Sequence, residues 1–236
     1  NFNGSDTINL TVDDGAGGPW NLTATAGTGS VAFTGIIGTA SGSGNRPDTL
    51  TVSGTGGITQ SAAIYLVGDL TVSGGTFATG GNAIELDGSL TGAGTLTAGA
   101  SSINIGTDLT LTTFTAGTST VTFDTATASN VGNYSFYDLV INKAAEANTV
   151  TATAGWTVTN SLTLTRGTLL AGTFTHLIAG DWDSSLATFT FTEGTSTVQL
   201  TSTNPTVTTE AGDAFNNLTF DDAGTLGSIL DINGNI

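Results

Sequence analysis

The sequence predicts an all-β chain folded as a parallel β-solenoid of about 20 residues per turn. Apolar and polar residues alternate along short runs such as INLTV, STVTF and SLTLT, as they do in strands with one buried face. Clusters of Gly, Ser and Asn separate these runs and indicate turns. One strand-and-turn phrase then returns at a fixed spacing, as LTVSGTGG from Leu50 and as LTVSGGTF from Leu70. Together these features indicate one short structural unit that is repeated many times along the chain.

Equivalent leucines mark the repeat in the N-terminal half. Leu50, Leu70, Leu90 and Leu109 follow one another at intervals of 20, 20 and 19 residues. In a solenoid each turn lays its strands on those of the turn before, so the same residue type recurs at the same place and stacks inwards. We therefore expect these leucines to form one column in the core. The Gly-rich corners are expected to supply the positive φ angles that sharp bends require.

A longer echo marks the C-terminal half. FTAGTSTVTF from Phe114 returns as FTEGTSTVQL from Phe191, an offset of 77 residues, and FYDLVIN from Phe136 returns as FNNLTFD from Phe215, an offset of 79. These offsets are close to four solenoid turns, but they also suit tandem β-sandwich domains, which remain the alternative architecture. We predict a single solenoid over 1–236, with regular 20-residue repeats over 1–112 and the longer 77–79-residue repeat over 113–236.

Charge and composition narrow the classes of partner. The chain has 19 acidic and three basic side chains, which give a formal net charge of −16. This charge disfavours nucleic acid and anionic membranes, because both are bound through Lys and Arg. The longest apolar run, Ala62–Val67, is too short to span a membrane. Cys and Met, the residues most open to oxidation, are both absent, which suits an extracellular or cell-surface location.

Several phrases resemble those of a known group of proteins. GTSTVTF, FYDLVIN, LTLTRGTLLAG and LIAGDW are similar to the Gly/Thr-rich β-strand-repeat regions of large bacterial surface and secreted proteins, of the filamentous-haemagglutinin-like and autotransporter-passenger-like kinds. The resemblance covers most of the chain. It implies an exported right-handed β-helix, bacterial or archaeal, that serves as a stalk, fibre or adhesive surface. Because the sequence opens without Met or a signal peptide, we also expect it to be a segment of a longer exported chain.

No pattern predicts catalysis, and we expect a protein that is not an enzyme and needs no cofactor. The cationic side chains that β-helical lyases need are reduced here to Arg46, Lys143 and Arg166, which are scattered along the sequence. His176, the sole histidine, lies in a predicted strand with no acidic neighbour within four residues, so we expect a structural role. Lys143 is expected to be solvated.

Asp181 and Asp183 in GDWDSS are the strongest candidates for a ligand site. In an extended strand both would point to one face, with their Cα atoms ~6.6 Å apart, a geometry that a glycosidase pair permits. Trp182 between them would offer a stacking platform for a sugar. The interpretation that we favour is a solvated turn with Trp182 in the core. Four other carboxylates are interpreted as turn residues, with low-affinity Ca²⁺ binding as the alternative. They are Asp13, Asp14, Asp221 and Asp222.

The function expected from these patterns is structural, as a stalk, sheath or filament, with adhesion as a further use. The end strands of a solenoid expose N–H and C=O groups, and edge-to-edge stacking of identical chains would satisfy them. The apolar residues expected at these assembly edges are Phe2, Ile8, Leu10, Ile229, Leu230 and Ile236. A carbohydrate-binding or carbohydrate-cleaving surface that contacts surface glycans is the alternative, and an ice-binding threonine array is third.

Overall fold

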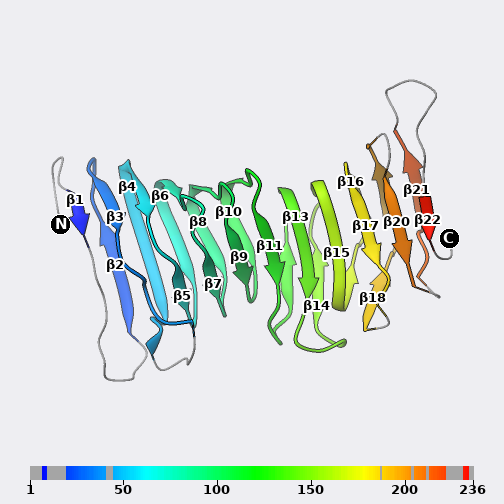
Figure 1. Ribbon diagram of the computed structural model, residues 1–236, viewed down its shortest axis with the longest axis horizontal. Helices are drawn as coiled ribbons and strands as arrows, with labels where there is room; N and C mark the ends of the chain where they lie inside the picture. Colours follow the sequence, from blue (N-terminus) through cyan, green and yellow to red (C-terminus); the bar gives the residue numbers. More distant parts are fainter. Residues whose placement is uncertain are drawn as a thin grey trace. The chain divides into compact units, whose positions relative to one another are not determined.

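The computed structural model describes residues 20–40, 45–186, 188–202, 205–210 and 213–221, and the backbone alone of 7–9 and 231–233. The chain divides into two compact units, residues 1–119 (unit 1) and 120–236 (unit 2), and each is described by itself. The regular elements of the described residues are all β-strands (Figure 1). These residues include no helix that is long and apolar enough to cross a membrane. The predicted change of pattern after residue 112 falls a few residues before the division, and a single solenoid over 1–236 stays a prediction.

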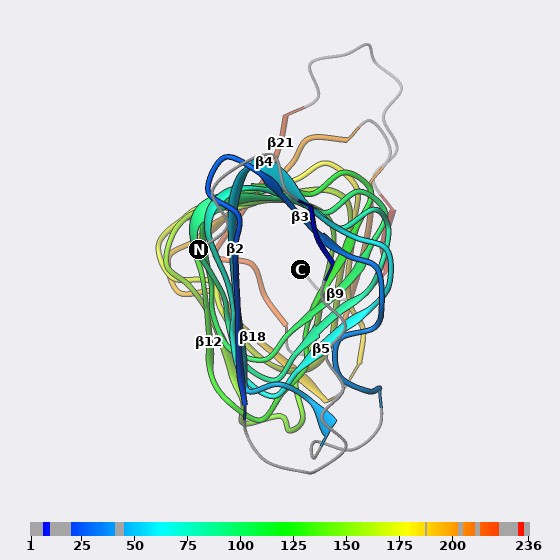
Figure 2. The ribbon, with the colours of Figure 1, turned by 90° about the vertical axis from the view of Figure 1, so that its left-hand side faces the viewer.

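Unit 1 is a parallel β-solenoid with two sheets. Its described strands are β1 (Thr7–Asn9), β2 (Asn21–Thr25), β3 (Ser30–Phe33), β4 (Thr49–Gln60), β5 (Ile64–Leu66), β6 (Leu70–Ala78), β7 (Ile84–Leu86), β8 (Leu90–Thr97), β9 (Ser102–Ile105) and β10 (Leu109–Thr115). Strands β5, β7 and β9 form sheet B and the others form sheet A, and each pairing within a sheet is parallel. Figure 2 shows β2 of sheet A and β5 and β9 of sheet B on opposite sides of the interior.

The predicted leucine column is confirmed. Leu50, Leu70, Leu90 and Leu109 stack in register from one turn to the next, and each is at most 1% exposed. A threonine follows each leucine and faces outwards, and the hydroxyl oxygens of Thr71 and Thr91 lie 3.2 Å apart. The fold class is thus a parallel β-solenoid with turns about 20 residues apart. The sandwich alternative is wrong, because each strand pairs in parallel with its equivalent one turn later.

Unit 2 has the same parallel construction with longer turns. Its described strands are β11 (Thr120–Phe123), β12 (Ser129–Val131), β13 (Ser135–Asn142), β14 (Thr149–Ala152), β15 (Thr157–Leu170), β16 (Thr175–Ile178), β17 (Asp181–Ser184), β18 (Phe189–Thr192), β19 (Thr197–Leu200), β20 (Thr206–Thr209), β21 (Asn217–Phe220) and β22 (Asp231–Asn233). Strands β12, β14 and β18 belong to sheet A, the long β15 begins in sheet B and ends in sheet A, and the rest belong to sheet B.

The corners use glycine as predicted, since each described residue with a positive φ is a glycine. Gly117 has a φ of 62°, and a Cβ added to it would overlap the carbonyl oxygen of Gly99 in the turn before. Gly194 stands over Gly172 in the same way in unit 2. The phrases TAGTST and TEGTST of the long echo are therefore the same corner, in which neither the left-handed backbone nor the stacking distance leaves room for a side chain.

Candidate functional site

Trp182, one of the predicted ligand residues, belongs to the core. The GDWDSS segment forms strand β17 and not the expected solvated turn, and alternation along it turns Trp182 inwards, where it is 2% exposed. Its ring packs edge-on against Phe191 at 5.0 Å and Phe215 at 5.1 Å between centroids, and its Nε1 donates a hydrogen bond to Ser184 Oγ at 3.0 Å. The favoured placement of Trp182 in the core agrees with this burial, and its ring is not accessible as a platform for a sugar.

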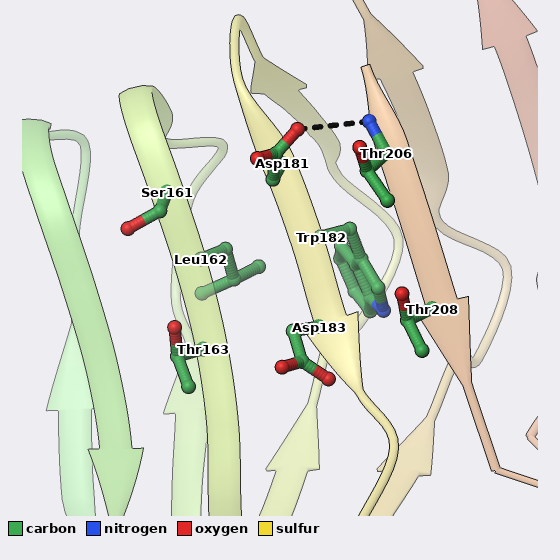
Figure 3. A pocket seen from close by; sticks show the side chains of 8 residues that line it. All are labelled: Ser161, Leu162, Thr163, Asp181, Trp182, Asp183, Thr206 and Thr208. Atoms are coloured by element: carbon green, nitrogen blue, oxygen red, sulfur yellow. Dashed lines mark hydrogen bonds between the residues drawn. The ribbon is translucent and has the colours of Figure 1, made fainter. Parts of the chain in front are cut away.

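Asp181 and Asp183 do lie together on the outer face of sheet B, as the alternation predicts. Ser161 and Thr163 of β15 stand beside them in register on one side, and Thr208 of β20 stands beside Asp183 on the other. With Thr206, these residues line a shallow groove of about 250 Å³ (Figure 3). Leu162 and Trp182 close its floor from the core side.

The two carboxylates of this groove are exposed, and each accepts one hydrogen bond from a backbone N–H group. Asp181 Oδ1 accepts a hydrogen bond from the Thr206 N–H at 2.8 Å, and Asp183 Oδ1 accepts one from the Ser185 N–H at 3.0 Å. Carboxylate oxygens accept hydrogen bonds and hydroxyl groups both donate and accept them, so the side chains that line the groove suit a polyhydroxyl ligand. Trp182, its one aromatic lining residue, is buried, so the groove offers no exposed ring for stacking.

Arg46 holds a long connection of unit 1 in place. Its guanidinium donates to the carbonyl oxygen of Thr39 at 2.9 Å, to that of Ala40 at 3.0 Å and to Glu85 Oε1 at 2.6 Å. It also lies 5.4 Å from the centroid of the Tyr65 ring. The side chain is buried, so its charge is used inside the unit and is not available to a partner.

Lys143 is buried at 1% exposure, which corrects the expectation of a solvated lysine. Its Nζ donates a hydrogen bond to Ser129 Oγ at 3.0 Å, and Ser129 is itself fully buried. Burial lowers the pKa of Lys143 to about 8, against the opposing effect of the Asp124 carboxylate. A signal for this burial exists in the sequence, because the inward alternation of Leu139 and Ile141 extends by one step to Lys143. Arg166 is the one exposed base of the chain's three.

His176 is structural, as expected. It is 2% exposed, and its ring lies edge-on to Trp156 with centroids 4.7 Å apart. Nε2 carries the proton because its partner, the carbonyl oxygen of Ala171 at 3.0 Å, can only accept. Burial lowers the pKa of His176, and the bond to Ala171 opposes this effect. The imidazole is therefore held neutral in the core.

Asp213 is a site residue that no pattern in the sequence indicates. It lies between β20 and β21, where its carboxylate is hydrogen-bonded by the Ser184 side chain and by the Phe191 backbone. Its Oδ2 is buried without a hydrogen-bond partner among the described residues. Both contacts come from the preceding turn, from residues 29 and 22 positions earlier in the chain, so no local pattern could have indicated them.

The remaining predicted residues fall mostly outside the described part of the chain. Those are Phe2, Leu10, Asp13, Asp14, Asp222, Ile229, Leu230 and Ile236. Ile8 lies in β1, in register with Val31 of β3. Asp221 is exposed and its Oδ2 accepts a hydrogen bond from Gln199 Nε2 at 3.1 Å. The described residues contain no group of three or more side chains suited to hold a metal ion, and Ca²⁺ binding stays a prediction.

No family model, curated protein or solved structure matches the chain. The resemblance to bacterial surface repeats therefore supports an expectation of function, and the parallel β-solenoid fold stands on the strand pairings themselves.

Proposed function

We propose that this chain is a structural segment of an exported surface protein, forming a stalk, sheath or filament by edge-to-edge stacking of solenoid units. The observation that carries the proposal is the stacking at the start of the long strands of unit 1, where Leu50, Leu70, Leu90 and Leu109 lie in register inside and the threonine after each of them lies in register outside. Each turn therefore offers the next turn the same surface that it meets on the turn before. A turn of another copy, offered in parallel to an end strand, would meet that same surface.

The charge distribution supports stacking at the ends over contact between the sides. Arg46 and Lys143 are buried, so acidic and hydroxyl side chains dominate the outer faces of a chain with net charge −16. Like charges on these faces repel one another and disfavour lateral association. Backbone N–H and C=O groups at a strand edge are neutral dipoles and escape this repulsion, which leaves the ends as the favoured contacts.

Electron microscopy and sedimentation of the purified chain across a concentration series test this proposal. We expect uniform fibres with a layer line near ~4.8 Å, the spacing of strands stacked across the axis. Ile8→Lys places a charge on β1 and is expected to reduce association, as charged residues do on natural edge strands. Thr110→Lys, on an exposed outer position of β10, is the matched control for added charge. A chain that stays monomeric at every concentration, or equal association of both variants, contradicts the proposal.

Contact with surface glycans is the second candidate, and the groove around Asp181 and Asp183 is the observation that favours it. A glycan array of the wild-type chain is compared with Asp183→Asn, and Asp221→Asn serves as the control for loss of an exposed charge. Binding that falls only in Asp183→Asn supports adhesion through this groove, and an array without signal contradicts it.

A further inference from the structure

Strand β18 of sheet A has one edge that is closed by a turn and a side chain. Along its other edge, the N–H groups of Gly167 in β15 and of Ala171, the residue that follows β15, donate to the carbonyl oxygens of Thr188 and Thr192. Successive residues of a parallel strand direct their backbone groups to opposite sides. The N–H groups of Phe189 and Phe191 therefore point away from β15, towards the position of a following turn.

Both of these outward N–H groups have partners. The Phe189 N–H donates to the carbonyl oxygen of Leu186 at 3.0 Å, within the turn that precedes β18. The Phe191 N–H donates to the carboxylate of Asp213, which comes from the segment between β20 and β21. Asp213 thus takes a ladder hydrogen bond that a strand of a following turn would otherwise receive.

A second contact fixes the carboxylate in this position. Ser184 Oγ accepts a hydrogen bond from Trp182 Nε1 at 3.0 Å, which leaves its own hydrogen free to donate to Asp213. Because Asp213 Oδ2 has no partner among the described residues, both donors act on Oδ1. The ring of Phe215, two residues later, packs against Trp182 and Phe191 and ties the segment to the core.

The charged form of Asp213 is poorly accommodated. Burial raises its pKa, the Ser184 and Phe191 hydrogen bonds lower it, and the nearby Glu193 carboxylate raises it further, with a net shift upwards. The charged group that acts on Asp213 is Glu193. The backbone N–H of Asp213 donates a hydrogen bond to the carbonyl oxygen of Glu210. The folded state therefore binds a proton at Asp213 more tightly than the unfolded chain does.

We propose that Asp213 is a proton-operated cap on sheet A of unit 2, which closes over the edge of β18 when its carboxyl group is protonated and loosens when it is ionised. Protonation of Oδ2 removes an uncompensated charge from this buried oxygen. Oδ1 can still accept the hydrogen bonds from Ser184 and Phe191. Ionisation restores that charge, and outward movement of residues 213–215, while β21 stays paired with β19, relieves it by exposing the carboxylate to water. The movement also frees the Phe191 N–H, a donor to which another strand can add.

Hydrogen exchange followed by mass spectrometry tests the cap directly. Because the folded pKa of Asp213 is raised, its contribution to stability is present below the unfolded value and is lost as the pH rises through the folded value. Protection factors of peptides covering β18 and 213–221, corrected for intrinsic exchange, are expected to be several-fold higher at about pH 3.5 than at about pH 7.5. In Asp213→Asn, which carries no titrating proton, the two values should agree more closely than in the wild-type chain.

The controls separate the cap from other titrations. His176, whose pKa burial lowers, is present in both the wild-type chain and Asp213→Asn, so the difference between them reports Asp213. Asp221→Asn removes an exposed carboxylate at the end of the same segment and should keep the wild-type response. An unchanged pH response in Asp213→Asn, or none in the wild-type chain, overturns the proposal.

One consequence rests on the proposed function. If copies add strands at this edge, Asp213→Asn, which mimics the closed cap, should associate less than the wild-type chain at about pH 7.5. A pH-dependent cap without any change in association leaves the cap in place and contradicts assembly through β18. Association without pH-dependent protection contradicts the cap and leaves the proposed function standing.

Discussion

Unit 1 and unit 2 fill the interior of similar turns in different ways. Unit 1 repeats one aliphatic column, and side-chain hydrogen bonds between its regular turns join residues 18 to 23 positions apart. Unit 2 places Trp156, His176 and Trp182 inside, together with the buried Lys143. Its equivalent hydrogen bonds span 20 to 25 positions.

The difference shows that a regular repeat of turns suits an aliphatic core, whereas a buried polar side chain needs a specific partner. An aliphatic column needs no specific partner, so one leucine stacks on another at any turn. A buried polar group left without a hydrogen bond costs roughly 1–3 kcal/mol, and several of those in unit 2 have a specific partner. Lys143 has Ser129, His176 Nε2 has the Ala171 carbonyl and Trp182 has Ser184. Trp156 Nε1 and Asp213 Oδ2 are buried without a partner among the described residues. The described side chains whose pKa is shifted all lie in unit 2, and unit 1 is the more uniform scaffold.

The largest expected effect is the loss of a side chain from the aliphatic column. Leu70→Ala removes a fully buried side chain between Leu50 and Leu90 and is expected to lower the free energy of unfolding by about 3–4 kcal/mol. Thr71→Ala, the adjacent outward position, should lower it by roughly 1 kcal/mol or less. Urea unfolding monitored by hydrogen exchange in unit 1 measures both. Equal losses in the two variants would show that the column does not carry the stability of unit 1.

A smaller effect is expected at the stacked corners. Gly117→Ala should cost about 2–3 kcal/mol, because it combines a left-handed backbone with overlap on the Gly99 carbonyl oxygen. Gly99→Ala has nearly the same φ, 60° against 62°, but its Cβ would meet no described atom closer than the backbone nitrogen of Gly81 at 3.7 Å. That variant should lose only the conformational part, about 1 kcal/mol. If the two variants are equally stable in urea, the corner is not constrained by stacking.

The third prediction concerns the buried lysine of unit 2. The folded chain binds the Lys143 proton less tightly, at a pKa of about 8, than the unfolded chain with its ordinary value of 10.5. Stability therefore rises with pH above about 8, on the order of 2 kcal/mol by pH 9.5. Lys143→Met should lack this rise, and Arg166→Met is the control at an exposed base. Measurements stop near pH 9.5 because Tyr134, whose pKa burial raises, then begins to contribute with the opposite sign.

This pH series also bears on the comparison between the units. The alkaline stabilisation should appear in the hydrogen-exchange protection of the peptides of unit 2 that contain Lys143 and Ser129. The same rise in Lys143→Met as in the wild-type chain would mean that Lys143 is solvated, as the sequence first suggested.

The sequence by itself determined the solenoid, the leucine column of unit 1 and the glycine corners. It could do so because each turn places a residue in the same surroundings as its equivalent one turn away, so the repeat spacing and the alternation of apolar residues carry the information. Alternation also put Trp182 inside and Asp181 and Asp183 outside, once the segment is taken as a strand.

The tertiary structure alone decided which side chains meet across the turns of unit 2. Turns of unequal length decide which residues lie next to each other in this unit. The examples are the contacts of Asp213 with Ser184 and Phe191 and the contact of Lys143 with Ser129. Turns that vary from 20 to 25 residues do not repeat a partner at a fixed offset, so no spacing in the sequence encodes these pairs. Burial and pKa then follow from the completed packing, because desolvation depends on all the atoms around a group and not on its neighbours in sequence.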